Sequence, residues 1–104
     1  MTEVLSVKIE KQKLRELEEI AREEKSDRST AARRLLDIGM KEWKINKAVE
    51  MFRRERLSLW KAAANSGLSL REFTEILDER RVDWVGVSIK DLDAEVRAIE
   101  KELR

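Results

Sequence analysis

Val4-Leu5-Ser6-Val7-Lys8-Ile9 is the stretch that decides the fold predicted from this sequence. Apolar and polar residues alternate in it, so residues 5, 7 and 9 would point to one side of a β-strand and residues 4, 6 and 8 to the other. The helices expected next along the chain cannot pair with the backbone of a lone strand. The sequence therefore predicts that this strand pairs, antiparallel and by two-fold symmetry, with the same strand of a second copy.

Two helices are expected after this strand. Leu14, Leu17 and Ile20 recur at helical spacing and predict a helix from about Lys11 to Glu24. A polar break leads to Ser29, which suits the N-cap of a second helix. That helix carries the apolar residues Ala32, Leu35, Leu36, Gly39 and Trp43. The first 44 residues thus have the order strand, helix, turn, helix, and such a small module favours a dimer because alone it buries little apolar surface.

In this order of elements the chain resembles the ribbon-helix-helix family of Arc- and MetJ-type repressors, over residues 2–43. The resemblance rests on the alternating strand, the two apolar helices and the turn Asp27-Arg28-Ser29-Thr30 between them. It implies a homodimer whose paired strands enter the major groove of double-stranded DNA. The outward residues of the strand would then contact bases, and here these are Val4, Ser6 and Lys8.

The resemblance also implies phosphate contacts at the start of the second helix, from Arg28, Ser29, Thr30 and Ala31. Free backbone N–H groups and the helix dipole favour an anion at such a helix end. Ser29 could equally serve only as a helix cap. The dimer core is predicted at Leu5, Val7, Ile9, Leu14, Leu17, Leu35 and Leu36.

A second helical module is predicted over residues 45–81. The spacing of Ala63, Gly67 and Phe73 matches a helix-turn-helix, and Ser69 with Glu72 predicts a capping box. If this module contacts DNA, a second surface would comprise Arg53, Arg54, Arg56 and Arg71. A small helical bundle that holds a partner or makes another dimer contact is the alternative.

The second module is also similar to a small family of prokaryotic antitoxin-like proteins. The similarity is carried by Ser58-Leu59-Trp60-Lys61-Ala62-Ala63, by Gly67-Leu68-Ser69 and by Phe73. It implies that the chain pairs with a small nuclease toxin.

The remaining residues, 82–104, predict a short strand over 84–89 and an amphipathic helix opened by Ser88 and Asp91. The apolar stripe of this helix comprises Leu92, Val96, Ile99 and Leu103. The segment could bind a partner protein or complete the core of the chain. The predicted fold class is mainly α with one N-terminal β-strand, in three parts: 1–44, 45–81 and 82–104.

Composition argues against several function classes. The chain contains no cysteine and no histidine, so the sequence predicts no disulfide, no metal site, no cofactor and no enzyme activity. No apolar run approaches the roughly 20 residues of a membrane span, which predicts a cytoplasmic protein without a membrane partner. Charged residues make up 43% of the chain and side-chain amides are few, a balance that resembles thermophile proteins.

These observations predict a homodimeric, sequence-specific transcriptional repressor that is the autoregulating antitoxin of a toxin–antitoxin pair. Two alternatives stay open. One is a protein-interaction scaffold in which the first module only dimerises, and the other is a general architectural DNA-binding protein.

Overall fold

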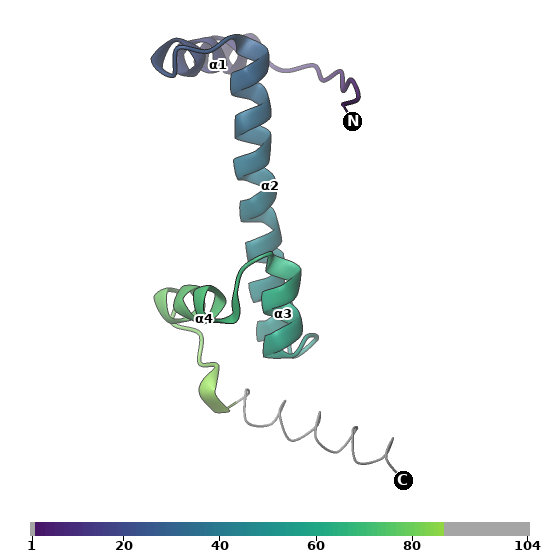
Figure 1. Cartoon of the computed structure of the whole chain (residues 1–104), viewed down its shortest axis with the longest axis vertical. Helices are drawn as coiled ribbons and strands as arrows, with labels where there is room; N and C mark the ends of the chain where they lie inside the picture. The colour runs from purple at the N-terminus through teal and green to yellow at the C-terminus, as the bar shows by residue number, and fades with distance from the viewer. Residues whose placement is uncertain (1, 87–104) are drawn as a thin grey trace. The chain divides into compact units, whose positions relative to one another are not determined.

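The computed structural model describes residues 2–86, which contain the helices α1 (Lys11–Glu23), α2 (Arg28–Arg53), α3 (Leu59–Ser66) and α4 (Leu70–Glu79) (Figure 1). The packing divides the chain into two units, Met1–Gly39 and Met40–Arg104, which we call unit 1 and unit 2. The predicted mainly helical character is thus confirmed for the described residues.

The predicted N-terminal strand is wrong. Residues 2–10 form neither helix nor strand, and all of them are exposed. A strand exists only where a second backbone accepts and donates its ladder of hydrogen bonds, and the described part of the chain offers no other strand for pairing. The ribbon-helix-helix arrangement inferred from this strand is therefore not the fold observed here. The alternating sequence predicts which side chains would lie on each face of a strand, but it does not supply the second strand that pairing requires.

Helix α1 is amphipathic, as its sequence predicts. Leu14, Leu17 and Ile20 are half-buried along one face, and Ala21 is fully buried. The helix ends where Lys25 adopts a left-handed backbone conformation with φ of 53°. The next N–H, that of Ser26, donates to the Ala21 carbonyl at 2.9 Å, which closes the helix end in a Schellman motif.

A single helix, α2, replaces the two helices that the sequence predicted on either side of residue 44. The residues around this point, Trp43-Lys44-Ile45, include neither glycine nor proline, so nothing in them ends a helix. The packing boundary between units 1 and 2 falls inside α2, after Gly39.

Unit 2 has a compact apolar core. Phe73 and Leu77 of α4 are fully buried, and Leu59 of α3 is 1% exposed. The rings of Phe52 and Phe73 lie 6.4 Å apart at 86°, an edge-to-face arrangement that stabilises aromatic pairs. The core residues are Ala48, Val49, Phe52, Leu59, Ala62, Ala63, Phe73 and Leu77. This core joins α2, α3 and α4.

The turn between α3 and α4 is fixed by local chemistry. Gly67 has φ of 80°, a left-handed conformation that glycine adopts without a Cβ penalty. The hydroxyl of buried Ser66 donates to the Ala63 carbonyl at 2.6 Å and accepts from the Leu68 N–H at 3.2 Å. The predicted helix-turn-helix geometry of small residue, glycine and buried Phe73 is consistent with this arrangement.

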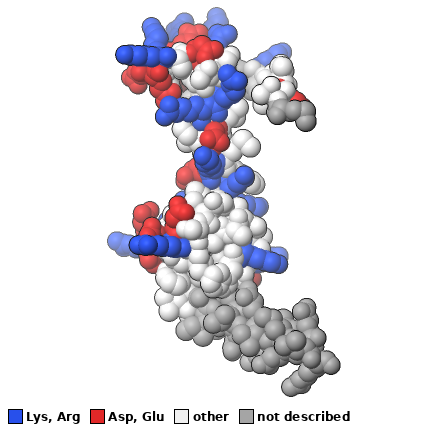
Figure 2. Space-filling model, in the orientation of Figure 1, with Lys and Arg blue, Asp and Glu red and all other residues white. Residues whose placement is uncertain are grey.

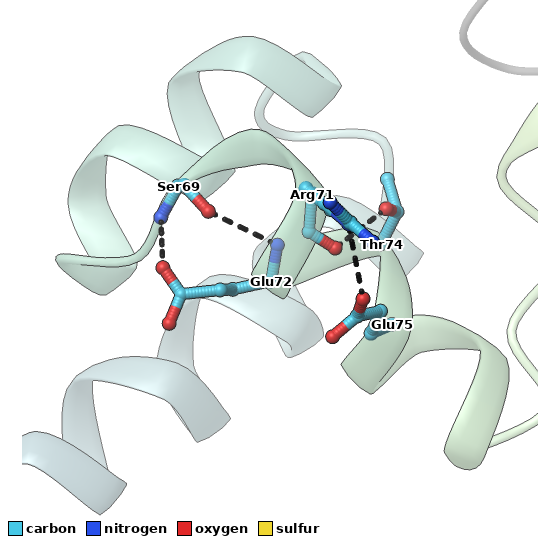
Figure 3. A network of polar contacts seen from close by, with 5 residues as sticks. All are labelled: Ser69, Arg71, Glu72, Thr74 and Glu75. Carbon is cyan, nitrogen blue, oxygen red and sulfur yellow. Dashed lines mark hydrogen bonds and ion pairs between the residues drawn. The ribbon is translucent and has the colours of Figure 1, made fainter.

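The predicted capping box at the start of α4 is confirmed (Figure 3). The backbone N–H of Glu72 donates to Ser69 Oγ at 3.1 Å, and the Ser69 N–H donates to the Glu72 carboxylate, also at 3.1 Å. Two N–H groups that the helix itself cannot satisfy are thereby paired.

The second predicted strand, over residues 84–89, is also wrong in its described part, because Val85 and Gly86 are helical. Trp84 is half-buried against the unit 2 core, and its indole N–H donates to the Asp78 carboxylate at 2.8 Å. The rest of this segment, with the predicted terminal helix, lies outside the described residues. Among residues 2–86, no helix is both long and apolar enough to cross a bilayer.

Candidate functional site

The predicted base-contacting side chains, Val4, Ser6 and Lys8, all lie in the N-terminal segment, residues 2–10, and are exposed. Val4 is 96% exposed, and the alternate apolar residues at 5, 7 and 9 are 73%, 68% and 48% exposed. Neither face of the segment is therefore covered by the described part of the chain. DNA contact by these three residues stays a prediction.

The start of α2 is capped by Asp27, so the predicted N-cap role of Ser29 is wrong. Helix α2 begins at Arg28, and the Thr30 N–H donates to the Asp27 carboxylate at 3.2 Å. Hydrogen bonding from Thr30, with a smaller contribution from the charge of Arg33, lowers the pKa of Asp27 below its ordinary value. The negative charge of Asp27 is thus held at the positive end of the α2 dipole.

This cap changes what the helix end can offer a phosphate. The Thr30 N–H is bonded to a carboxylate, and an anion approaching it would meet the like charge of Asp27. The Ala31 side chain is fully buried, whereas Arg28 and Ser29 are exposed. Arg28 lies 3.5 Å from the Glu18 carboxylate, an exposed ion pair that water and salt weaken. Arg28 and Ser29 are consequently the members of the predicted phosphate site best placed for an anion.

Unit 1 has an apolar surface with almost no core beneath it. Among its described residues only Ala21 and Ala31 are buried. On α2, Leu35, Leu36 and Ile38 are 39%, 52% and 54% exposed. We call six exposed side chains the unit 1 apolar set: Leu5, Val7 and Ile9 of the N-terminal segment, and Leu35, Leu36 and Ile38 of α2. Four of the seven residues predicted for the dimer core are exposed on the single chain to at least 48%: Leu5, Val7, Ile9 and Leu36.

Charges of both signs cover unit 1, but they are distributed unevenly along the chain (Figure 2). Basic residues dominate from residue 8 to residue 15, with Lys8, Lys11, Lys13 and Arg15 against a single acid. Acidic residues dominate the remainder of α1, at Glu16, Glu18, Glu19 and Glu23. The basic end of unit 1 is thus the end that begins with Lys8.

The second predicted DNA surface consists mostly of arginines that are paired with acids. Arg54 lies 2.8 Å from Glu50, Arg53 lies 3.9 Å from the same carboxylate group, and Arg71 lies 3.5 Å from Glu75. Arg56 is exposed in the turn after α2. DNA contact by these four arginines stays a prediction.

Helix α4, which would be the recognition helix of a helix-turn-helix, is acidic. Arg71 is its one basic residue, and its carboxylates are Glu72, Glu75, Asp78 and Glu79. Figure 3 shows Arg71 turned along the helix toward Glu75. Four carboxylates on a short helix repel a phosphate backbone, and this favours unit 1 over α4 as a DNA-contacting surface.

The sequence prediction missed two residues of unit 1: the residue that caps α2, and one of its exposed apolar residues. Asp27 is a preferred N-cap residue type, so its position before Arg28 could have identified it. Ile38 is not among the apolar residues that the sequence prediction assigned to this helix, although it adds a side chain that is 54% exposed to the unit 1 apolar set.

Within residues 2–86 no cluster of acidic side chains could hold a metal ion. An open hollow in unit 2 has both charge signs in its lining, which comprises Phe52, Arg53, Glu55, Arg80, Arg81, Val82 and Asp83.

Comparison with known proteins adds a family to this description. No curated protein and no solved structure matches the chain. A family model does match residues 15–101, a range that begins within α1 and includes α2, α3 and α4, and it lends no support to the ribbon-helix-helix resemblance. Because the match covers most of the sequence, the chain belongs to the uncharacterised protein family UPF0175.

Proposed function

We propose that this protein is a homodimeric DNA-binding regulator that serves as the antitoxin of a toxin–antitoxin pair. The observation that carries the proposal is the composition of unit 1. Its described residues expose seven large apolar side chains, namely the six of the unit 1 apolar set and Val4, and bury two alanines. The three parts of the proposal, the dimer, the DNA contact and the toxin, rest on different residues and are tested separately.

The dimer follows from the energy that the unit 1 apolar set could provide. Covering a fully exposed leucine, isoleucine or valine side chain contributes about 1.5–3 kcal/mol. With the exposures given above, covering the six side chains would contribute on the order of 5–10 kcal/mol per protomer. Two protomers would together contribute about 10–20 kcal/mol, which is of the same order as the roughly 4–15 kcal/mol that association costs. A second copy is a partner that is present whenever the chain is made, and it offers the same surface.

DNA contact is supported by the position of the basic residues. Lys8 is exposed at the start of the basic stretch that runs to Arg15, and Arg28 is exposed at the turn before α2. Both belong to the unit that would dimerise, so a dimer would present each of them twice. Lysine and arginine that neutralise phosphates supply most of the sequence-independent affinity for DNA.

The toxin partner is supported by sequence similarity and by exposed apolar residues in unit 2. Residues 58–63, 67–69 and Phe73 are similar to antitoxin-like proteins. Unit 2 leaves Met40 and Trp43 59% and 64% exposed, and exposed side chains of this size are typical of protein-binding surfaces. Co-purification of the untagged product of the neighbouring gene with the tagged protein tests this part. We expect a small nuclease in a stable complex, and its absence would contradict the antitoxin role.

A scaffold that dimerises without binding DNA is the second candidate, and one observation favours it. Unit 1 contains as many acidic as basic residues, so its net charge is zero. Its affinity for DNA would therefore depend on the local basic stretch that begins at Lys8.

Lys8→Ala distinguishes the two candidates. We expect the variant to remain dimeric and to bind the duplex upstream of its own gene less tightly, by about 1–3 kcal/mol if Lys8 contacts a base. Fluorescence anisotropy titration measures this loss. Lys61→Ala is the matched control, because Lys61 is also exposed but lies on α3, outside every predicted DNA surface. Equal affinity of both variants and the wild type would leave the scaffold as the better account.

A further inference from the structure

Gly39 lies inside α2, and none of the described residues requires a glycine there. It is exposed, and among the described glycines only Gly67 has a positive φ. A Cβ built on Gly39 would meet no atom of residues 2–86 within 4 Å. Glycine in a helix interior costs roughly 1 kcal/mol relative to alanine. The chain thus carries a destabilising residue at a position where a larger side chain would fit.

The neighbours of Gly39 on α2 are apolar. Helical spacing places Ala32, Leu35 and Leu36 on the same face, at seven, four and three residues before it. Leu35 and Leu36 are 39% and 52% exposed, and Ala32 is half-buried. A helix face on which leucines alternate with small residues is suited to close approach by another backbone.

We infer that Gly39 marks the point where α2 of a second copy crosses α2 in the dimer. This inference rests on the homodimer of the proposed function and adds to it the position of the crossing. In a two-fold dimer a residue next to the axis meets its own copy, so Gly39 would face Gly39 of the second protomer. Packed helices usually keep their axes about 8–10 Å apart, and the missing side chain at this position allows a closer approach.

Disulfide cross-linking tests the crossing directly, because the chain has no cysteine of its own. Two cysteines form a disulfide when their Cα atoms lie about 4.4–6.8 Å apart. We expect Gly39→Cys to give a covalent dimer under mild oxidation, at least about tenfold faster than the control Lys44→Cys. Lys44 is exposed on the same helix but lies roughly 140° around its axis from Gly39.

The outcomes separate this inference from the proposal on which it rests. If the wild type and both cysteine variants sediment as dimers and Gly39→Cys cross-links no faster than Lys44→Cys, the crossing is placed wrongly while the dimer stands. If the wild type sediments as a monomer, the homodimer itself fails, and the crossing fails with it.

A larger side chain at position 39 tests the crossing in a second way, through the dimer dissociation constant. Gly39→Leu should raise the dimer dissociation constant at least about tenfold, because the added side chain separates the two helices. Lys44→Leu, which adds the same side chain elsewhere on α2, should leave that constant unchanged. A Gly39→Leu dimer as tight as the wild type, with higher helicity by circular dichroism, would show that Gly39 only weakens α2 and would overturn the inference.

Discussion

Three of the four described helices are followed by a residue other than glycine that has a left-handed backbone conformation. Glycine at these positions should stabilise the protein. Lys25, Glu55 and Arg81 have φ of 53°, 58° and 57°. Each follows the C-cap of its helix, the position at which a left-handed residue closes the helix end. All three are exposed, so their side chains contribute little packing.

The size of the gain follows from two opposing effects at each site. The left-handed conformation costs a residue that has a Cβ about 1–2 kcal/mol of folding free energy. Glycine avoids this cost but loses more backbone entropy on folding, by roughly 0.5–1 kcal/mol. We therefore expect Glu55→Gly and Arg81→Gly each to raise the free energy of unfolding by about 0.5–1 kcal/mol.

Urea unfolding followed by far-UV circular dichroism measures this gain, at a fixed protein concentration because dimerisation would couple to unfolding. Gly67→Ala is the matched control of opposite sign, since Gly67 ends α3 with φ of 80°. It should lower the free energy of unfolding by about 1 kcal/mol. If Gly67→Ala behaves as expected while Glu55→Gly and Arg81→Gly both destabilise the protein, the reasoning about these helix ends is refuted.

Other variants and conditions test the core and the caps. Phe73→Ala should cost about 3–5 kcal/mol of unfolding free energy because Phe73 is fully buried, whereas Lys61→Ala, at an exposed position, should cost under about 0.5 kcal/mol, both by urea unfolding. The pKa of Asp27 is lowered by hydrogen bonding from Thr30, and that of Glu72 by hydrogen bonding from Ser69. Because these pKa values lie below the ordinary 3.8 and 4.5, the caps stabilise the fold above those values. Their contribution should disappear as the pH falls through the lower folded-state values. Asp27→Asn and Glu72→Gln should each reduce this pH dependence in urea titrations, and an unchanged profile would argue against the caps.

Features that depend on neighbouring residues were predictable from the sequence. The capping box of Ser69 and Glu72 and the turn at Gly67 involve groups within a few residues of one another, and both were predicted. The amphipathic spacing of α1 was predicted for the same reason. Phe73 was predicted as the apolar residue of the helix after the turn at Gly67, and it is fully buried.

Features that depend on a competition or on a distant partner were not predictable. Asp27 and Ser29 can both cap a helix, and the structure places the helix start at Arg28, directly after Asp27. The alternation over residues 4–9 is that of a strand, yet a strand also needs a partner backbone, which no local pattern provides. The continuity of α2 through Trp43-Lys44-Ile45 agrees with the absence of glycine and proline from these residues, although the sequence prediction divided the chain at this point.

The mass of the full chain in solution tests the central claim most directly, namely that a second copy covers unit 1. Sedimentation equilibrium of the folded protein should give twice the chain mass of 12.3 kDa, with dissociation on dilution that Leu36→Lys makes easier. A chain that is helical by circular dichroism and sediments at 12.3 kDa across the whole concentration range would contradict the account.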